Sequence, residues 1–139
     1  MNIYPRLQFD AQRFSEAFDR EPVPFTHNLG DLDLFQMSAL YGLAEKFTGS
    51  PRDYMVAGGA PKPDTEFFSV PGVADKPHEV LAKLDSGSYR ILLKRAENYD
   101  RRYKELVETL FERVIALRGG LQGAKVVRLE SGILISSAA

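Results

Sequence analysis

The stretch YRILLKRAENYDRRYKELVETLFERVIALRGG, residues 89–120, decides the fold because it holds the clearest strand and the clearest helix of the chain. Its first part, residues 89–97, has a continuous apolar centre, Ile91-Leu92-Leu93. An apolar run without polar alternation is typical of a strand whose two faces are both covered. We therefore predict a central strand here, buried on both faces.

The second part of the stretch predicts a helix from about Arg101 to Leu117. Asp100 is a favourable N-cap residue, because its carboxylate can accept hydrogen bonds from the free N–H groups of the first turn. Gly119 and Gly120 favour the end of the helix. Apolar residues recur every three or four positions, and we expect this stripe to make the helix a main contributor to the core. The stripe consists of Tyr103, Leu106, Val107, Leu110, Phe111, Val114 and Leu117.

Weaker patterns surround this stretch. Helices are predicted after Asp10, at residues 37–47 and at residues 75–84, and strands at residues 24–29, 53–59 and 124–137, the last of them continuous or broken at Ser131-Gly132. Residues 60–77 carry four prolines and predict a long loop. Four helices and about five strands, with the strands gathering toward the end, indicate an α+β fold.

Composition excludes several classes of protein. The 139 residues fit one domain, and a net charge of -1 gives no electrostatic reason to expect nucleic-acid binding. There is no cysteine, which removes disulfides, thiolate nucleophiles and cysteine-based metal sites. The first residues do not have the pattern of a secretory signal, and no apolar run approaches the roughly 18 residues of a membrane span. We expect a cytoplasmic protein that does not enter a membrane.

The candidate metal ligands are few. The chain has two histidines, His27 and His78, and neither starts an H-x-D, H-x-E or H-E-x-x-H pattern, because Leu29 and Val80 stand two residues further on. A hydrogen-bonded histidine in a strand is the expected role of His27. We predict no metal site and no catalytic residue in this chain.

Four segments occur in a suggestive order: EPVPFTHNL (21–29), DLFQMSALYGLAEKF (33–47), RILLKRAE (90–97) and RLESGILISS (128–137). In this order they resemble the amino-terminal part of bacterial cupin-like proteins of the jumonji-C type. The resemblance implies that residues 1–120 are a lead-in of helices and strands, and that residues 121–139 are the first strands of an incomplete cupin barrel, a double-stranded β-helix.

In that family the barrel binds Fe(II) and 2-oxoglutarate, so the resemblance implies a 2-oxoglutarate-dependent oxygenase as the full-length parent. The family's H-x-D/E iron motif follows a strand that resembles GILISSAA, and no position of this chain matches it. The resemblance places Ser136 and Ser137 near the mouth of the cofactor site, as residues that line a pocket. The chain itself would hold no cofactor.

A second interpretation treats residues 1–139 as a small stand-alone α+β module for protein interaction. Its binding surface would be the loop at residues 60–77 or the edge of the terminal strand, since an exposed edge can recruit another strand. The final apolar run, Ile133-Leu134-Ile135, needs a cover in either case. We expect that cover to be the missing half of a barrel, or a second copy that associates through the C-terminal strand.

Overall fold

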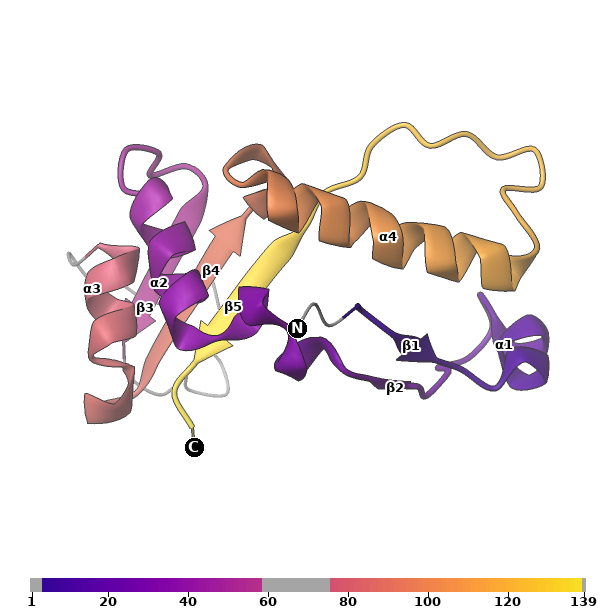
Figure 1. Ribbon diagram of the computed structural model, residues 1–139, viewed down its shortest axis with the longest axis horizontal. Helices are drawn as coiled ribbons and strands as arrows, with labels where there is room; N and C mark the ends of the chain where they lie inside the picture. The colour runs from indigo at the N-terminus through magenta and orange to yellow at the C-terminus, as the bar shows by residue number, and fades with distance from the viewer. Residues whose placement is uncertain (1–3, 59–75, 139) are drawn as a thin grey trace.

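The computed structural model describes residues 4–58 and 76–138, and this part of the chain forms four α-helices and five β-strands (Figure 1). The elements are β1 (Leu7–Gln8), α1 (Ala11–Ala17), β2 (Thr26–His27), α2 (Met37–Lys46), β3 (Tyr54–Gly58), α3 (Pro77–Ala82), β4 (Tyr89–Lys94), α4 (Arg101–Arg118) and β5 (Gly132–Ser136). The predicted α+β class is confirmed. Of the predicted loop, residues 60–75 lie outside the described residues, and Pro77 begins α3.

The main sheet has three antiparallel strands in the order β3-β4-β5. Leu93 of β4 lies opposite Tyr54 of β3 and Ile133 of β5, and Leu92 lies opposite Met55 and Leu134. Because side chains alternate along a strand, the two sets point to opposite faces. The stretch of residues 89–97 therefore supplies the central strand, as predicted.

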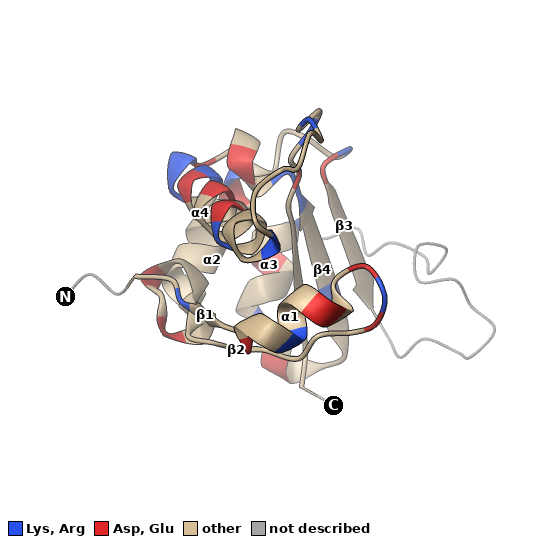
Figure 2. Ribbon diagram, turned by 90° about the vertical axis from the view of Figure 1, so that its right-hand side faces the viewer, with Lys and Arg blue, Asp and Glu red and all other residues tan. Residues whose placement is uncertain are grey.

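The helices cover one face of this sheet. Figure 2 shows α2 and α3 on the same side of the strands, and α3 contacts both β3 and β4. The core between these layers is formed by residues from both: Leu40, Leu43, Ala44, Phe47, Val56, Val80, Leu81, Ile91, Leu93, Ala96 and Tyr103. Burying their apolar surface at roughly 25 cal/mol per Å² is what holds the two layers together.

The other side of the sheet, called the open face here, carries Leu92 and Leu134. Leu92 is only half-buried, and the side chain of Leu134 is 58% exposed. The prediction that β4 is buried on both faces was therefore wrong for this face. An apolar run cannot distinguish a strand covered on both sides from one that the described residues cover on one side only.

Helix α4 begins and ends where predicted. Asp100 caps it through a hydrogen bond from the Arg102 N–H (2.9 Å), and Gly119 at its C-terminus has a φ of 91°, which glycine adopts without strain. Only Tyr103 and Leu106 of its apolar stripe are buried. The expectation that α4 is a main contributor to the core was wrong, because most of the helix extends beyond the sheet (Figure 1).

The charged surface of α4 carries both signs, as Figure 2 shows. Arg101 is paired with Glu105 at 2.9 Å, and Lys104 with Glu108 at 4.0 Å. Pairs of this kind on an exposed helix contribute a few tenths of a kcal/mol each. They leave α4 without a patch of a single charge.

The far end of α4 packs on a small second cluster, formed by β1, β2 and α1. Here Phe14 is 3% exposed and contacts Phe9 and Phe18, while Phe9 stacks on Phe25 at 4.6 Å between ring centroids. Arg118 of α4 lies 5.5 Å from the Phe18 ring centre. This aromatic cluster, separate from the main core, holds the amino-terminal segment against α4.

The last predicted strand is shorter than expected. Only Gly132–Ser136 pair in the sheet, whereas residues 122–128 are exposed and irregular, with Val127 at 91% exposure. Neither predicted alternative, one continuous strand or two strands broken at Ser131-Gly132, is found, because residues 124–131 form no strand and β5 begins at Gly132. Among the helices of residues 4–58 and 76–138, none has the length and apolar character needed to cross a membrane.

Candidate functional site: the edge of strand β5

Strand β5 lies at one side of the sheet, and hydrogen bonding shows which of its backbone groups face outward. Arg95 N–H donates to the Ser131 carbonyl (2.8 Å), and Ser137 N–H donates to the Tyr89 carbonyl (2.9 Å). Because hydrogen-bonded pairs alternate in an antiparallel ladder, Ile133 and Ile135 also bond to β4. The backbone groups of the residues between them point away from β4.

We call these outward groups, on Gly132, Leu134 and Ser136, the β5 edge. None of them has a hydrogen-bond partner within residues 4–58 and 76–138. The strand itself, Gly-Ile-Leu-Ile-Ser, carries no charge and no proline. Charges and prolines are the usual means of preventing a sheet edge from pairing, so this edge is suited to accept another strand.

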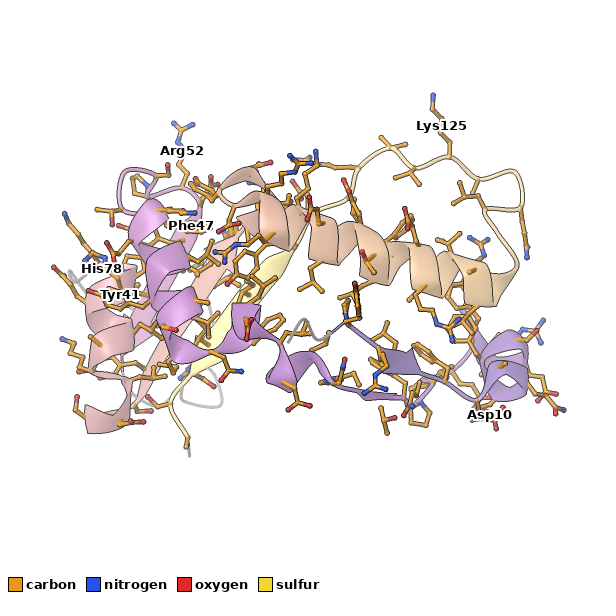
Figure 3. All side chains as sticks on the ribbon, viewed as in Figure 1. Asp10, Tyr41, Phe47, Arg52, His78 and Lys125 are labelled. Atoms are coloured by element: carbon orange, nitrogen blue, oxygen red, sulfur yellow. The ribbon has the colours of Figure 1, made fainter. Side chains whose placement is uncertain are left out.

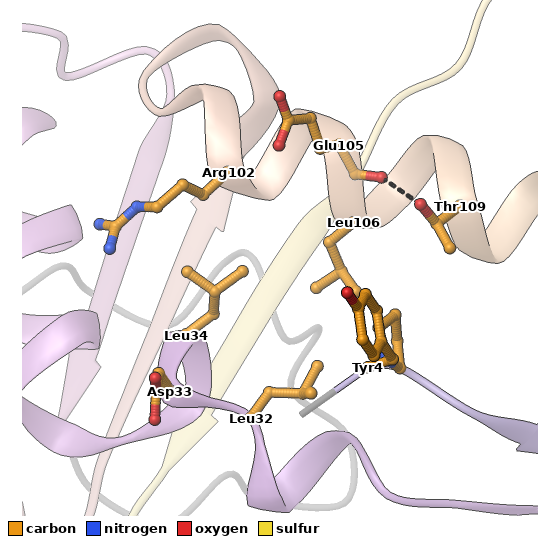
Figure 4. A pocket seen from close by; sticks show the side chains of 9 residues that line it. Tyr4, Leu32, Asp33, Leu34, Arg102, Glu105, Leu106 and Thr109 are labelled. Carbon is orange, nitrogen blue, oxygen red and sulfur yellow. Dashed lines mark hydrogen bonds between the residues drawn. The ribbon is translucent and has the colours of Figure 1, made fainter. Parts of the chain in front are cut away.

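A pocket of about 430 Å³ lies between α4 and the segment that leads to α2. Figure 4 shows Leu34 and Leu106 on its walls and Tyr4 at one end. The Tyr103 hydroxyl donates to the Leu34 carbonyl at 2.6 Å and fixes one wall. Leu34 packs against the same core cluster as Ile133 and Ile135, but no residue of β5 lines the pocket.

The charged groups at the rim of this pocket are largely neutralised within the chain. Arg102 is paired with Asp100 at 2.9 Å, and Glu105 with Arg101 at 2.9 Å. The third, Asp33, lies at the opposite end of the pocket from Tyr4 (Figure 4). The pocket therefore combines apolar walls, from Leu32, Leu34 and Leu106, with polar groups at its rim.

The two serines assigned by resemblance point to different surroundings. The Ser137 hydroxyl donates to the Leu84 carbonyl (2.6 Å) and accepts the Tyr89 N–H (3.0 Å), so it ties the end of β5 to β4 and to the turn before it. Ser136 is exposed on the open face. The structure does not bring them together around one cavity, and their role near a cofactor stays a prediction.

The two histidines are far apart in the fold. His27 Nδ1 accepts the Leu29 N–H at 3.2 Å, which makes it the hydrogen-bonded strand histidine that the sequence indicates. His78 of α3 lies beside Tyr41 of α2, with their rings 5.6 Å apart and nearly perpendicular (Figure 3). Within the described residues, no three His, Cys, Asp or Glu side chains are grouped as metal ligands.

Two polar clusters brace the fold around the site. In the first, the buried Asp100 carboxylate accepts hydrogen bonds from Arg102 (2.9 Å) and Lys46 (3.0 Å), and so links α4 to α2. The hydrogen bonds from Arg102, followed by that from Lys46, hold the pKa of Asp100 well below its ordinary value of 3.8. Asp100 therefore has two structural roles: it caps α4 and links α4 to α2.

The second cluster joins the start of β3 to the end of β4. The Asp53 carboxylate accepts hydrogen bonds from Tyr99 and Arg95, and the hydrogen bond from Tyr99 is the main reason that the pKa of Asp53 is lowered. Arg95 has a φ of 58°, a left-handed conformation that is unusual for a residue other than glycine. The ion pair with Asp53 keeps Arg95 in this turn, which directs the chain from β4 toward α4.

The sequence signalled part of this site and missed the rest. The uncharged run Gly132–Ser136 identified the strand and raised the possibility of a free edge. The pocket depends on side chains from segments about 70 residues apart, Leu34 and Leu106, and no local pattern could have placed them together.

Comparison with known proteins finds no family model, no curated protein and no solved structure that matches this chain.

Proposed function

We propose that this chain is an assembly unit whose β5 edge is completed by a further β-strand. The main support is the set of outward backbone groups on Gly132, Leu134 and Ser136. They belong to an uncharged strand on which the Leu134 side chain is exposed. Backbone pairing along an edge supplies affinity, and alternate side chains supply specificity. An added strand would also place a side chain next to Leu134 on the open face.

We expect the added strand to come from a single extended segment rather than from a second folded copy of this chain. Figure 1 shows α4 and the β1–β2 pair continuing past β5 on the side away from β4. A single extended segment brings only one strand toward these elements, whereas a second copy would bring its own helical layer as well. We therefore do not propose the two-copy association through the C-terminal strand that the sequence suggested.

The strand has two candidate sources with the same chemistry. One is the next strand of a cupin barrel, in which case the parent is a 2-oxoglutarate-dependent oxygenase of the jumonji-C type that binds Fe(II). A sheet with helices on one face supports this source, as do an edge next to Ser136 that has no partner within the described residues and the resemblance of the four segments. The other source is an extended segment of a separate partner, which would make the chain an interaction module.

The test uses a fluorescein-labelled peptide of residues 131–137, SGILISS, which has the alternation that an added strand needs. We expect its fluorescence anisotropy to rise with the concentration of the chain. Leu134→Pro removes one outward N–H without touching the ladder to β4, and proline is tolerated at such edge positions. This variant should bind the peptide at least tenfold more weakly, whereas Leu134→Thr, which keeps the N–H, should bind within threefold of wild type.

A second arm distinguishes the sources. The reading frame is followed beyond the codon for Ala139, and any longer product is purified. An H-x-D/E motif, stoichiometric binding of Mn(II) with 2-oxoglutarate, and loss of peptide binding in the longer product would assign the strand to a barrel. A longer or unchanged product that still binds the peptide and no metal would assign it to a partner. The proposal is overturned if no form of the chain binds the peptide.

A further inference from the structure

We infer that the pocket between α4 and the segment leading to α2 binds a small amphipathic amine, with its ammonium group at Asp33 and its apolar body on the leucine walls. The volume of the pocket, about 430 Å³, lies within the range of small-molecule sites. The inference is independent of strand pairing, because no residue of β5 lines this pocket.

The walls of the pocket suit an apolar body. Leu106 of α4 and Leu32 of the facing segment are both buried, and Leu34 is half-buried beside them (Figure 4). At one end lies the ring of Tyr4, a residue that is 76% exposed. A ligand body that covers these side chains is favoured in proportion to the apolar area that it removes from water.

The charges of the pocket select the sign of the ligand. Its lining contains two carboxylates, Asp33 and Glu105, and one guanidinium, that of Arg102. The Arg102 guanidinium is already bound to the Asp100 carboxylate through Nε (3.2 Å) and Nη2 (2.9 Å). Glu105 is paired with Arg101, whereas the Asp33 carboxylate has no hydrogen-bond or ion-pair partner within the described residues. A cation therefore gains a free partner here, and an anion does not.

The free carboxylate and the exposed ring lie at opposite ends of the pocket, with the leucines between them (Figure 4). An amine on an aromatic or aliphatic body can contact both ends. Because Asp33 is exposed, the ammonium group keeps part of its hydration when it binds there. An exposed ion pair contributes little, so we expect the apolar body to supply most of the affinity and Asp33 to select the charge.

Three small molecules serve as probes, because they share an aromatic ring and differ in the charge of the head group: phenethylamine, phenethyl alcohol and phenylacetate. Each is added to the chain in increasing concentration, and amide chemical shifts are followed by NMR. We expect phenethylamine to shift the signals of Leu34 and Leu106 until they saturate. It should bind at least tenfold more tightly than phenylacetate, with the alcohol between the two.

One pair of variants tests the charge. Asp33→Asn should weaken phenethylamine binding by about threefold to fivefold, the effect of an ion pair that stays exposed, and leave binding of the alcohol unchanged. Asp31→Asn is the matched control, because it removes the same charge from an exposed residue that does not line the pocket. It should leave the binding of both molecules unchanged.

A second pair of variants tests the walls. Thr109 is exposed on α4, lines the pocket, and donates its hydroxyl to the Glu105 carbonyl of its own helix (2.8 Å). Thr109→Trp should occupy the space of the ligand body and weaken phenethylamine binding at least fivefold. Ala116→Trp, at an exposed position of α4 outside the lining, should leave it within twofold of wild type.

Circular dichroism and urea unfolding verify that each variant is folded. Shifts at Leu34 and Leu106 that saturate, prefer the amine and respond to Asp33→Asn and Thr109→Trp would support the inference. It is overturned if phenylacetate binds as tightly as phenethylamine, or if each control weakens binding as much as the variant it is matched to. It is also overturned if phenethylamine causes no saturable shift at these two leucines.

Discussion

Two leucines on opposite faces of the sheet give the sharpest test of how its layers are covered. Leu93 of β4 is fully buried between Tyr54 and Ile133, beneath the helical layer. Leu134 of β5 is 58% exposed on the open face. The same substitution, leucine to alanine, should therefore have very different effects at the two sites.

For Leu93→Ala we expect the free energy of unfolding to fall by about 2–5 kcal/mol, the range for a buried leucine that leaves a cavity. With a urea m-value of about 2 kcal/mol/M, the unfolding midpoint should fall by about 1 M or more. For Leu134→Ala we expect a loss below about 0.5 kcal/mol, as at an exposed surface position.

Urea unfolding followed by circular dichroism at 222 nm measures both values on matched samples. A loss of about 2 kcal/mol or more for Leu134→Ala would show that the open face is covered in the isolated chain, and the reasoning about a free binding surface would be refuted. A loss for Leu93→Ala no larger than that for Leu134→Ala would refute the assignment of the helix-covered face as the core.

Three further predictions concern the clusters around the site. Asp100 has a lowered pKa in the folded state, so its ionised form contributes stability that is present above about pH 4 and is lost as the pH falls. Asp100→Asn should therefore flatten the decline of the urea unfolding midpoint between about pH 4 and pH 2. An unchanged dependence of the midpoint on pH would contradict this. The Tyr99 hydroxyl donates to Asp53, which raises the pKa of Tyr99 above 10.0. In Asp53→Ala we therefore expect the pKa of Tyr99 to fall, as measured by NMR of ring-labelled tyrosine. Phe14→Ala should accelerate amide exchange in α1 and leave β4 unaffected, because the aromatic cluster is separate from the main core; equal acceleration in β4 would show a single cooperative core.

The elements of the fold were predictable where local signals agree with one another. The helix of residues 101–118 has a cap, an apolar stripe and terminal glycines, and the strand at residues 89–94 has an unbroken apolar centre. These signals depend only on neighbouring residues, and the structure confirms both elements. What they could not predict is which surface each element covers, because that depends on partners distant in the sequence.

The site shows the same division. The sequence displays the uncharged strand β5, whose outward backbone groups have no partner within the described residues. The pocket requires Leu34, from the segment that leads to α2, to lie near Leu106 of α4. The apolar stripe of α4 was predicted to be core because periodicity does not report what lies opposite a helix face. Residues 124–128 show the converse, since Val126 and Val127 favour a strand but have no neighbouring strand in the described part of the chain.

Amide hydrogen exchange along β5, measured by NMR residue by residue, tests the central claim most directly. In the free chain, the N–H groups of Leu134 and Ser136 should exchange rapidly, whereas those of Ile133 and Ile135, bonded to β4, should be protected. On saturation with the SGILISS peptide, Leu134 and Ser136 should become protected as well. Equal protection of Leu134 and Ile135 in the free chain, or no change at Leu134 on addition of the peptide, would contradict the account.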